Sequence, residues 1–103
     1  MKFATGTFVF ATLCLIGSQT ITVSAYTGEK LAKNAKVKIE QATAFALKER
    51  PGKITDKELE REKGGSGLRY SFDILSKGTK YEVGIDAQTG VVLENSKEGA
   101  HSD

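Results

Sequence analysis

Three carboxylates have the residue type and spacing of a cation site. Glu58, Asp73 and Glu82 each lie on the polar side of one of three consecutive segments between residues 53 and 87. If these segments pair as neighbouring strands, the side chains form a row across one sheet face, where like charges call for a counterion. Hard cations such as Ca²⁺ take several oxygen ligands. A solvated face is the alternative that we favour, because flat strands lack the looped carbonyls that complete a calcium shell.

A second polar group alternates in sign. Glu62, Arg69 and Asp86 follow one another across the same predicted face, at its other end. Exposed ion pairs of this kind contribute ~0–1 kcal/mol and are common on monomers. We therefore interpret the group as surface pairing, with docking of a protein partner as the sharper alternative.

Covalent catalysis requires a nucleophile, a base and an orienting group, and the sequence does not bring such a set together. The one histidine, His101, lies in the terminal stretch 95–103, and the one cysteine, Cys14, lies in an apolar run near the N-terminus. A hydrolase that uses the carboxylates is disfavoured, because we expect no deep cleft in a sheet whose one face is covered by a single helix. We expect a protein that is not an enzyme and has no cofactor.

Residues 1–25 have the order of a secretory signal peptide. Lys2 precedes the apolar run Phe8–Gly17, and the small-residue site Val23-Ser24-Ala25 comes just before the chain turns polar. The apolar run is shorter than the roughly 20 residues that a membrane span needs. We expect cleavage after Ala25 and a periplasmic or secreted protein with no membrane attachment afterwards. An uncleaved anchor is the weaker alternative.

The charge composition limits which classes of partner we expect. The chain has 15 lysines and arginines against 13 acidic residues, so its charge is nearly balanced. Proteins that bind nucleic acid usually carry a clustered basic face. We therefore expect no nucleic acid among the partners.

The elements that must position these residues follow from periodicity. Apolar residues recur with helical spacing from Ile39, and Pro51 and Gly52 end that helix. Three segments alternate with period two and a short closing strand follows them, at residues 53–62, 68–75, 80–87 and 91–93. The pattern predicts an α+β fold in which one helix packs on a three- to four-stranded antiparallel meander sheet.

This domain is expected to occupy residues 37–94. Residues 26–36 are polar, rich in lysine and without periodicity, and they predict a flexible leader. Residues 95–103 predict a disordered tail, because chain ends that nothing ties down are usually mobile.

A two-residue turn at residues 77–78 would fix the register of the second hairpin. It sets Phe72 opposite Val83 and pairs apolar residues along the whole hairpin, and a slip of one residue would expose the entire set. For the first hairpin we predict that Leu59 lies opposite Phe72.

Three runs of sequence, taken in order, carry a resemblance to a known family. The run IEQATAFALKERPGKI, from Ile39 to Ile54, is followed by LRYSFDI and then by YEVGIDAQTGVVLE, which ends at Glu94. Together they resemble the PepSY domain, a module named from peptidase propeptides and a spore-cortex regulatory protein. The resemblance covers residues 37–94, and it implies an exported domain of helix and sheet that binds or inhibits peptidases.

We therefore expect a non-enzymatic exported binding module with a protein or peptide partner, which the resemblance identifies as a peptidase. Edge strands offer unpaired main-chain groups to an extended peptide. The first segment carries lysines that would discourage non-specific pairing and select an acidic peptide: Lys53, Lys57 and Lys63. A cation-responsive accessory or sensor domain of the cell envelope, using the acidic row, is the alternative. The oligomeric state is left open.

Overall fold

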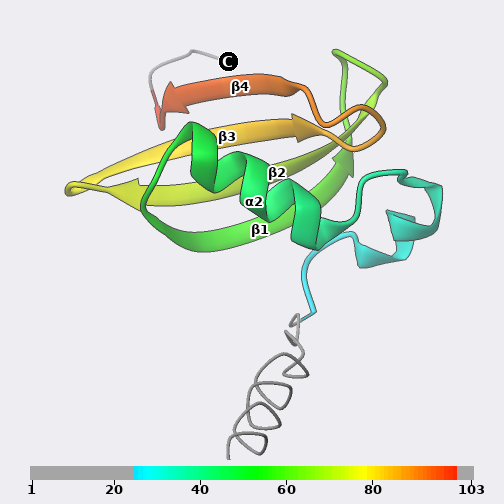
Figure 1. The fold of residues 1–103 in the computed structure, drawn as a ribbon, viewed down its shortest axis with the longest axis horizontal. Helices are drawn as coiled ribbons and strands as arrows, with labels where there is room; N and C mark the ends of the chain where they lie inside the picture. The colour runs from blue at the N-terminus through cyan, green and yellow to red at the C-terminus, as the bar shows by residue number, and fades with distance from the viewer. Residues whose placement is uncertain (1–24, 100–103) are drawn as a thin grey trace, which may run out of the picture.

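A computed structural model describes residues 25–99, in which one helix covers one face of a four-stranded sheet (Figure 1). The elements are the 3₁₀ helix η1 (Glu29–Asn34), the helix α2 (Ile39–Glu49), and the strands β1 (Lys53–Arg61), β2 (Leu68–Ser76), β3 (Thr79–Asp86) and β4 (Val92–Lys97). The strands lie in the order β1-β2-β3-β4, and every neighbouring pair is antiparallel. The predicted α+β fold, with its meander sheet, is confirmed. The predicted signal peptide, with Cys14, and His101 lie outside the described residues, apart from Ala25.

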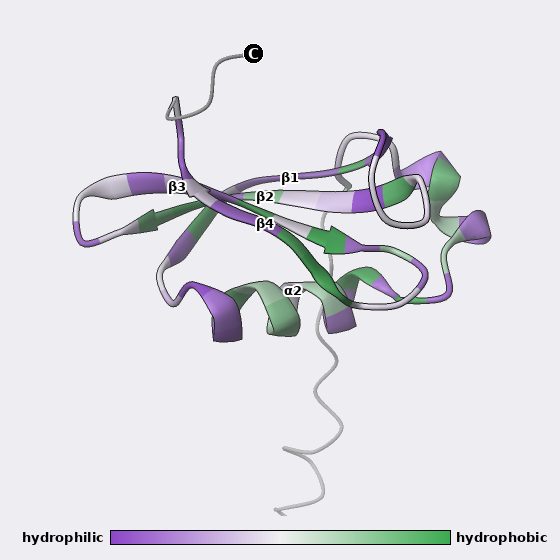
Figure 2. Ribbon diagram, turned by 90° about the horizontal axis from the view of Figure 1, so that it is seen from above, coloured by the Kyte–Doolittle hydropathy of each residue, from purple (hydrophilic) through white to green (hydrophobic). Residues whose placement is uncertain are grey.

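The core forms between α2 and the inner face of the sheet. Ala42 and Ala46 are fully buried on the helix, and their small side chains let it approach the strands closely. The sheet contributes larger side chains, of which Phe72 and Val83 are completely buried in its two central strands. Figure 2 shows these two layers edge-on, with α2 on one side of the sheet only. The other sheet face is therefore left to polar side chains.

The start of α2 is capped by a side chain from within the helix and not by the residue that precedes it. Lys38 precedes the helix and has no side-chain acceptor, so we expect a poorly capped start. In the structure, Gln41 reaches back and its Oε1 accepts a hydrogen bond of 2.9 Å from the Lys38 N–H. This is half of a capping box, and it satisfies one main-chain donor near the end of the helix.

The register predicted for the second hairpin is confirmed. Phe72 lies opposite Val83, and the turn consists of Lys77 and Gly78, with φ of 50° and 80°. Positive φ at both central positions is the type I′ arrangement, whose twist matches that of the flanking strands.

The register predicted for the first hairpin is wrong by two residues. Leu59 lies opposite Tyr70 instead of Phe72. The connecting loop closes on itself, because the Glu62 N–H donates to the Gly67 carbonyl at 3.1 Å, and this leaves Leu68 in the strand as a core residue with 2 % exposure. A shift of two residues keeps the side chains from Asp56 to Arg61 on their predicted faces, and the register shift between Ile54 and Asp56 changes the face only of the residues before it.

Residues 26–36, which we call the strap, differ from the flexible leader predicted for them. They contain η1, and Tyr26 and Leu31 pack against the core. Just beyond the strap, the Val37 N–H donates to the Ala87 carbonyl at 2.9 Å, and the Val37 carbonyl accepts a 2.7 Å hydrogen bond from the Tyr70 hydroxyl. The lysine-rich composition gave no sign of this packing, because only every fourth or fifth residue of the strap is apolar and contacts the core.

The C-terminal boundary also moves. β4 continues to Lys97, so three residues assigned to the predicted tail pair with β3. A bulge interrupts this pairing between Gly84 and Ile85, where a mid-strand glycine weakens the regular ladder. Within residues 25–99, no helix is long and apolar enough to cross a membrane.

Candidate functional site

The predicted cation row does not assemble. Asp73 lies opposite Glu82, but Glu58 pairs with Ser71, and Asp56 takes the place beside Asp73 because of the register shift. Among residues 25–99, no three Asp, Glu, His or Cys side chains come together in a way that could hold a metal ion. The cation site is therefore wrong for this part of the chain.

The carboxylates of the outer face carry the signature of crowded negative charge. Burial raises the pKa of Asp73, and the neighbouring charges of Glu98 and Asp56 raise it further. Burial also raises the pKa of Glu82, followed by the charges of Glu94 and Asp73. The negative charges of these carboxylates therefore repel one another, and the side chains do not converge on a common point.

The group Glu62, Arg69 and Asp86 is brought together, but it is not the exposed ladder that we expected. Arg69 lies opposite Asp86 across the strands, and its Nη1 is 3.1 Å from Glu94 Oε1, whereas Glu62 is 4.0 Å away. Arg69 is 8 % exposed and Asp86 is 1 % exposed, so neither side chain is displayed to a partner. Gly84 makes room for Arg69, since a Cβ there would lie 2.8 Å from Arg69 Nη1.

Asp86 organises the adjoining loops. Its carboxylate accepts main-chain hydrogen bonds from Ser66 at 2.7 Å, Gln88 at 2.8 Å and Thr89 at 3.1 Å. Burial alone would raise the pKa of Asp86, but these donors outweigh it and hold the pKa below its ordinary value. The residue is a structural acceptor, and its burial leaves almost none of its surface for a partner to contact.

The outer edge of β1 is where main-chain groups remain available. The Leu59 N–H points away from β2, because it donates to the Thr27 carbonyl at 2.9 Å, and Thr27 forms an isolated parallel bridge with Glu58. Main-chain direction alternates along an antiparallel strand, so the N–H and C=O of Lys57 also face outward. Among residues 25–99, the strap thus covers the edge from the Lys57 carbonyl to Leu59 and leaves the main-chain groups before it, beginning with the Lys57 N–H, open.

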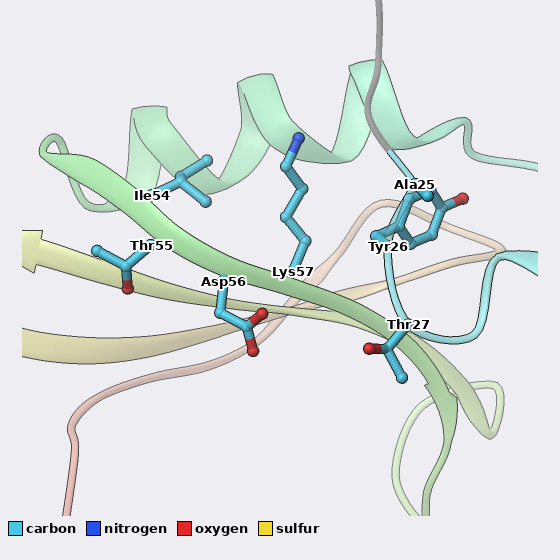
Figure 3. Close-up of a pocket in the computed structure, with 7 residues that line it drawn as sticks. All are labelled: Ala25, Tyr26, Thr27, Ile54, Thr55, Asp56 and Lys57. Atoms are coloured by element: carbon cyan, nitrogen blue, oxygen red, sulfur yellow. The ribbon is translucent and has the colours of Figure 1, made fainter.

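An open cleft of about 490 Å³ lies between the strap and this edge. One wall is formed by residues 25–27 and the other by residues 54–57 (Figure 3). Figure 3 shows Ile54 and Lys57 directed toward the α2 side, and Thr55 and Asp56 directed to the opposite side. The register shift between Ile54 and Asp56 explains why two neighbouring side chains share one side. We expected no deep cleft, and this open cleft exists because the strap supplies one of its walls.

The cleft offers binding groups and lacks the arrangement of a catalytic site. Asp56 and Lys57 leave β1 on opposite sides, so they do not act on one reacting atom. What the cleft presents is an edge with outward main-chain donors and acceptors, flanked by the ring of Tyr26. Such an edge can pair with an extended peptide.

Comparison with known proteins gives one match. The model of the family described as "Peptidase propeptide and YPEB domain" (PepSY) matches residues 36–95. Neither the curated proteins nor the solved structures contain a match to the chain.

Proposed function

The chain belongs to the PepSY family of peptidase propeptide and YPEB domains, and from this we propose that it is a non-enzymatic, inhibitor-like module whose partner is a peptidase. We further propose that an extended segment of the peptidase pairs with the outer edge of β1. The observation that carries this proposal is the cleft of about 490 Å³ along residues 54–57, where main-chain groups face outward.

The strap supports an extended chain as the occupant. Thr27 already makes a parallel bridge with Glu58, so this edge accepts a strand at one end of the cleft. A partner segment that enters the cleft would continue the same row of main-chain hydrogen bonds along the open residues. Affinity would come from the main chain, and side chains on alternate positions would set specificity.

A second copy of this chain is a poorer occupant. Two β1 edges that paired antiparallel about a two-fold axis would place like faces together, so Lys57 would meet the basic side of the other copy and Asp56 its acidic side. The β4 edge is also less suitable, because the bulge at Gly84 and Ile85 interrupts the ladder next to it.

Export is part of the proposal. The signal-like order of residues 1–25 supports delivery to the periplasm or the medium, where exported peptidases would be met.

The test compares two substitutions at Lys57. Lys57→Pro removes the outward N–H without touching a hydrogen bond to β2, whereas Lys57→Thr removes the same charge and keeps the N–H. The initial rate of peptide hydrolysis by a thermolysin-type metallopeptidase is measured with increasing amounts of each purified protein. We expect wild type and Lys57→Thr to slow the peptidase, and Lys57→Pro to need about tenfold more protein, the equivalent of one lost hydrogen bond.

Thermal unfolding of the two variants checks that both remain folded. An unchanged rate with the wild-type protein would remove inhibition of this peptidase class. Equal inhibition by both variants would remove the β1 edge as the docking surface while leaving the inhibitory role in place.

A further inference from the structure

A second pocket lies at the end of the sheet opposite the strap. Figure 1 shows the C-terminal end of α2 and the β2–β3 turn together at that end. The pocket has a volume of about 250 Å³, and its lining contains no acidic side chain: Arg50, Pro51, Ser76, Lys77, Thr79 and Tyr81.

Arg50 is held in place before any ligand arrives. Its guanidinium carbon lies 3.7 Å from the centre of the Tyr81 ring, and its Nε donates to Asn95 Oδ1 at 3.2 Å. Asn95 is itself fixed, because its Nδ2 donates to Glu49 Oε2 at 3.1 Å. Stacking and the Nε hydrogen bond use the flat face and one donor of the guanidinium.

The two terminal amino groups of Arg50 keep their donors. Within residues 25–99 they take part in no hydrogen bond or ion pair. A guanidinium fork with fixed orientation and free N–H groups matches the geometry of a carboxylate or phosphate group. The nearest acidic side chain in the sequence, Glu49, is already engaged by Asn95.

Lys77 stands at a backbone position that suits other residues better. Its φ of 50° makes it the one non-glycine residue with positive φ in the described part of the chain. The left-handed region costs an ordinary residue about 1–2 kcal/mol, and this position of a type I′ turn favours Asn, Asp or Gly. Strain of this kind is concentrated at functional sites. The lysine brings an ammonium group to the lip of the pocket, and in residues 25–99 it has no acidic partner.

Two hydroxyl groups complete the set. Ser76 and Thr79 lie opposite each other at the end of the hairpin and are half-buried. Neither hydroxyl forms a hydrogen bond to another part of residues 25–99, so both can donate to a ligand.

We propose that this pocket binds an oxyanion, a phosphate or carboxylate group, between the Arg50 guanidinium, the Lys77 ammonium and the hydroxyls of Ser76 and Thr79. The site is separate from the β1 edge and does not depend on the proposed peptidase binding. The C-terminal end of the α2 dipole disfavours an anion here, because it is equivalent to about half a negative charge. The two full positive charges of Arg50 and Lys77 outweigh it.

The test titrates the purified protein with inorganic phosphate, with acetate and with chloride at constant ionic strength, and follows the amide signals of Ser76, Lys77 and Thr79 and the Arg50 Nε–H by NMR. We expect saturable shifts of these four signals. Saturation by phosphate alone assigns a phosphoryl ligand, and saturation by acetate as well assigns a carboxylate such as the C-terminus of a peptide. Shifts that saturate with neither anion, or that are equally large in chloride, would overturn the site.

Variants separate this site from general charge effects. Lys77→Asn removes the ammonium and suits the turn, so the fold should be at least as stable while the anion affinity falls about tenfold. Arg50→Lys keeps the charge and loses the fork, and a similar loss is expected. Lys80→Gln is the matched control, because Lys80 lies in the same hairpin on the opposite sheet face. An unchanged affinity in Lys77→Asn, or an equal loss in Lys80→Gln, would also overturn the proposal.

Discussion

Replacing Tyr70 by Phe should remove the hydrogen bond that ties Val37, the residue after the strap, to the sheet. Tyr70 is 1 % exposed, and its hydroxyl donates to the Val37 carbonyl at 2.7 Å. Val37 is itself buried, so its carbonyl would lose its partner without gaining full access to water. An unsatisfied buried acceptor costs about 1–3 kcal/mol, and we expect the free energy of unfolding to fall by this amount near neutral pH.

The same substitution should remove a specific pH dependence. Burial raises the pKa of Tyr70 from 10.0 to about 12, with further contributions from Tyr26 and Glu40. Below the lower value, both the folded and the unfolded chain hold the proton. Between the two values the unfolded chain releases a proton that the folded chain keeps, so stability falls as the pH rises. A pKa difference of this size lowers the free energy of unfolding by about 2–3 kcal/mol once the pH has risen to the higher of the two values.

Urea unfolding at a series of pH values from neutral to strongly alkaline measures both effects. Tyr81→Phe is the control, because Tyr81 is half-buried beneath Arg50 and its hydroxyl forms no hydrogen bond within residues 25–99. We expect Tyr70→Phe to be less stable than wild type near neutral pH and to lose less stability on alkaline titration. A variant with wild-type stability and a wild-type alkaline slope would refute the reasoning, since the hydroxyl would then be neither bonded nor buried in solution.

Two further substitutions test other contacts. Asp86→Asn should lower the free energy of unfolding by about 2 kcal/mol or more, because an amide nitrogen would face the Ser66 N–H; chemical unfolding measures this. The lowered pKa of Asp86 means that its stabilisation is present above the ordinary pKa and is lost on acidification, so the variant should show less acid sensitivity than wild type. Gly28→Ala should detach the strap, since a Cβ at Gly28 would collide with the Leu59 carbonyl, whereas Gly78→Ala has the same sign of φ and open space. Faster exchange of the Leu59 amide in Gly28→Ala alone is the expected result; equal exchange in both would show that the strap tolerates the collision.

The sequence predicted well where one pattern had a single physical solution. The two-residue turn at residues 77–78 fixes the register that pairs Phe72 with Val83, and alternation excludes a slip of one residue, which would expose the apolar side chains of both strands. The helix from Ile39 was equally constrained, because its spacing and Pro51 set both ends. In these elements a shift of one residue would expose the core.

The register of the first hairpin was not constrained in this way. A shift of two residues keeps each side chain on its own face, so the periodicity of β1 fits several alignments equally well. The loop decided between them, through the hydrogen bond from Glu62 to Gly67 and the burial of Leu68. The geometry of a loop with several glycines is hard to derive from sequence. The register moved Glu58 away from the acidic row, whereas Asp86 differs from its predicted place because it is buried.

The candidate binding edge was harder still to derive, because no residue type marks it. Every residue has the main-chain N–H and C=O that pair with an extended peptide, and the open stretch of β1 is defined by where the strap stops covering it. The strap is held there by Thr27 and by packing of Tyr26, in a segment whose lysines favour solvent. If the strap competes with a partner for the end of the edge at Leu59, detaching it with Gly28→Ala should strengthen peptidase inhibition. Weakened inhibition would instead mean that the strap forms a wall that the partner needs.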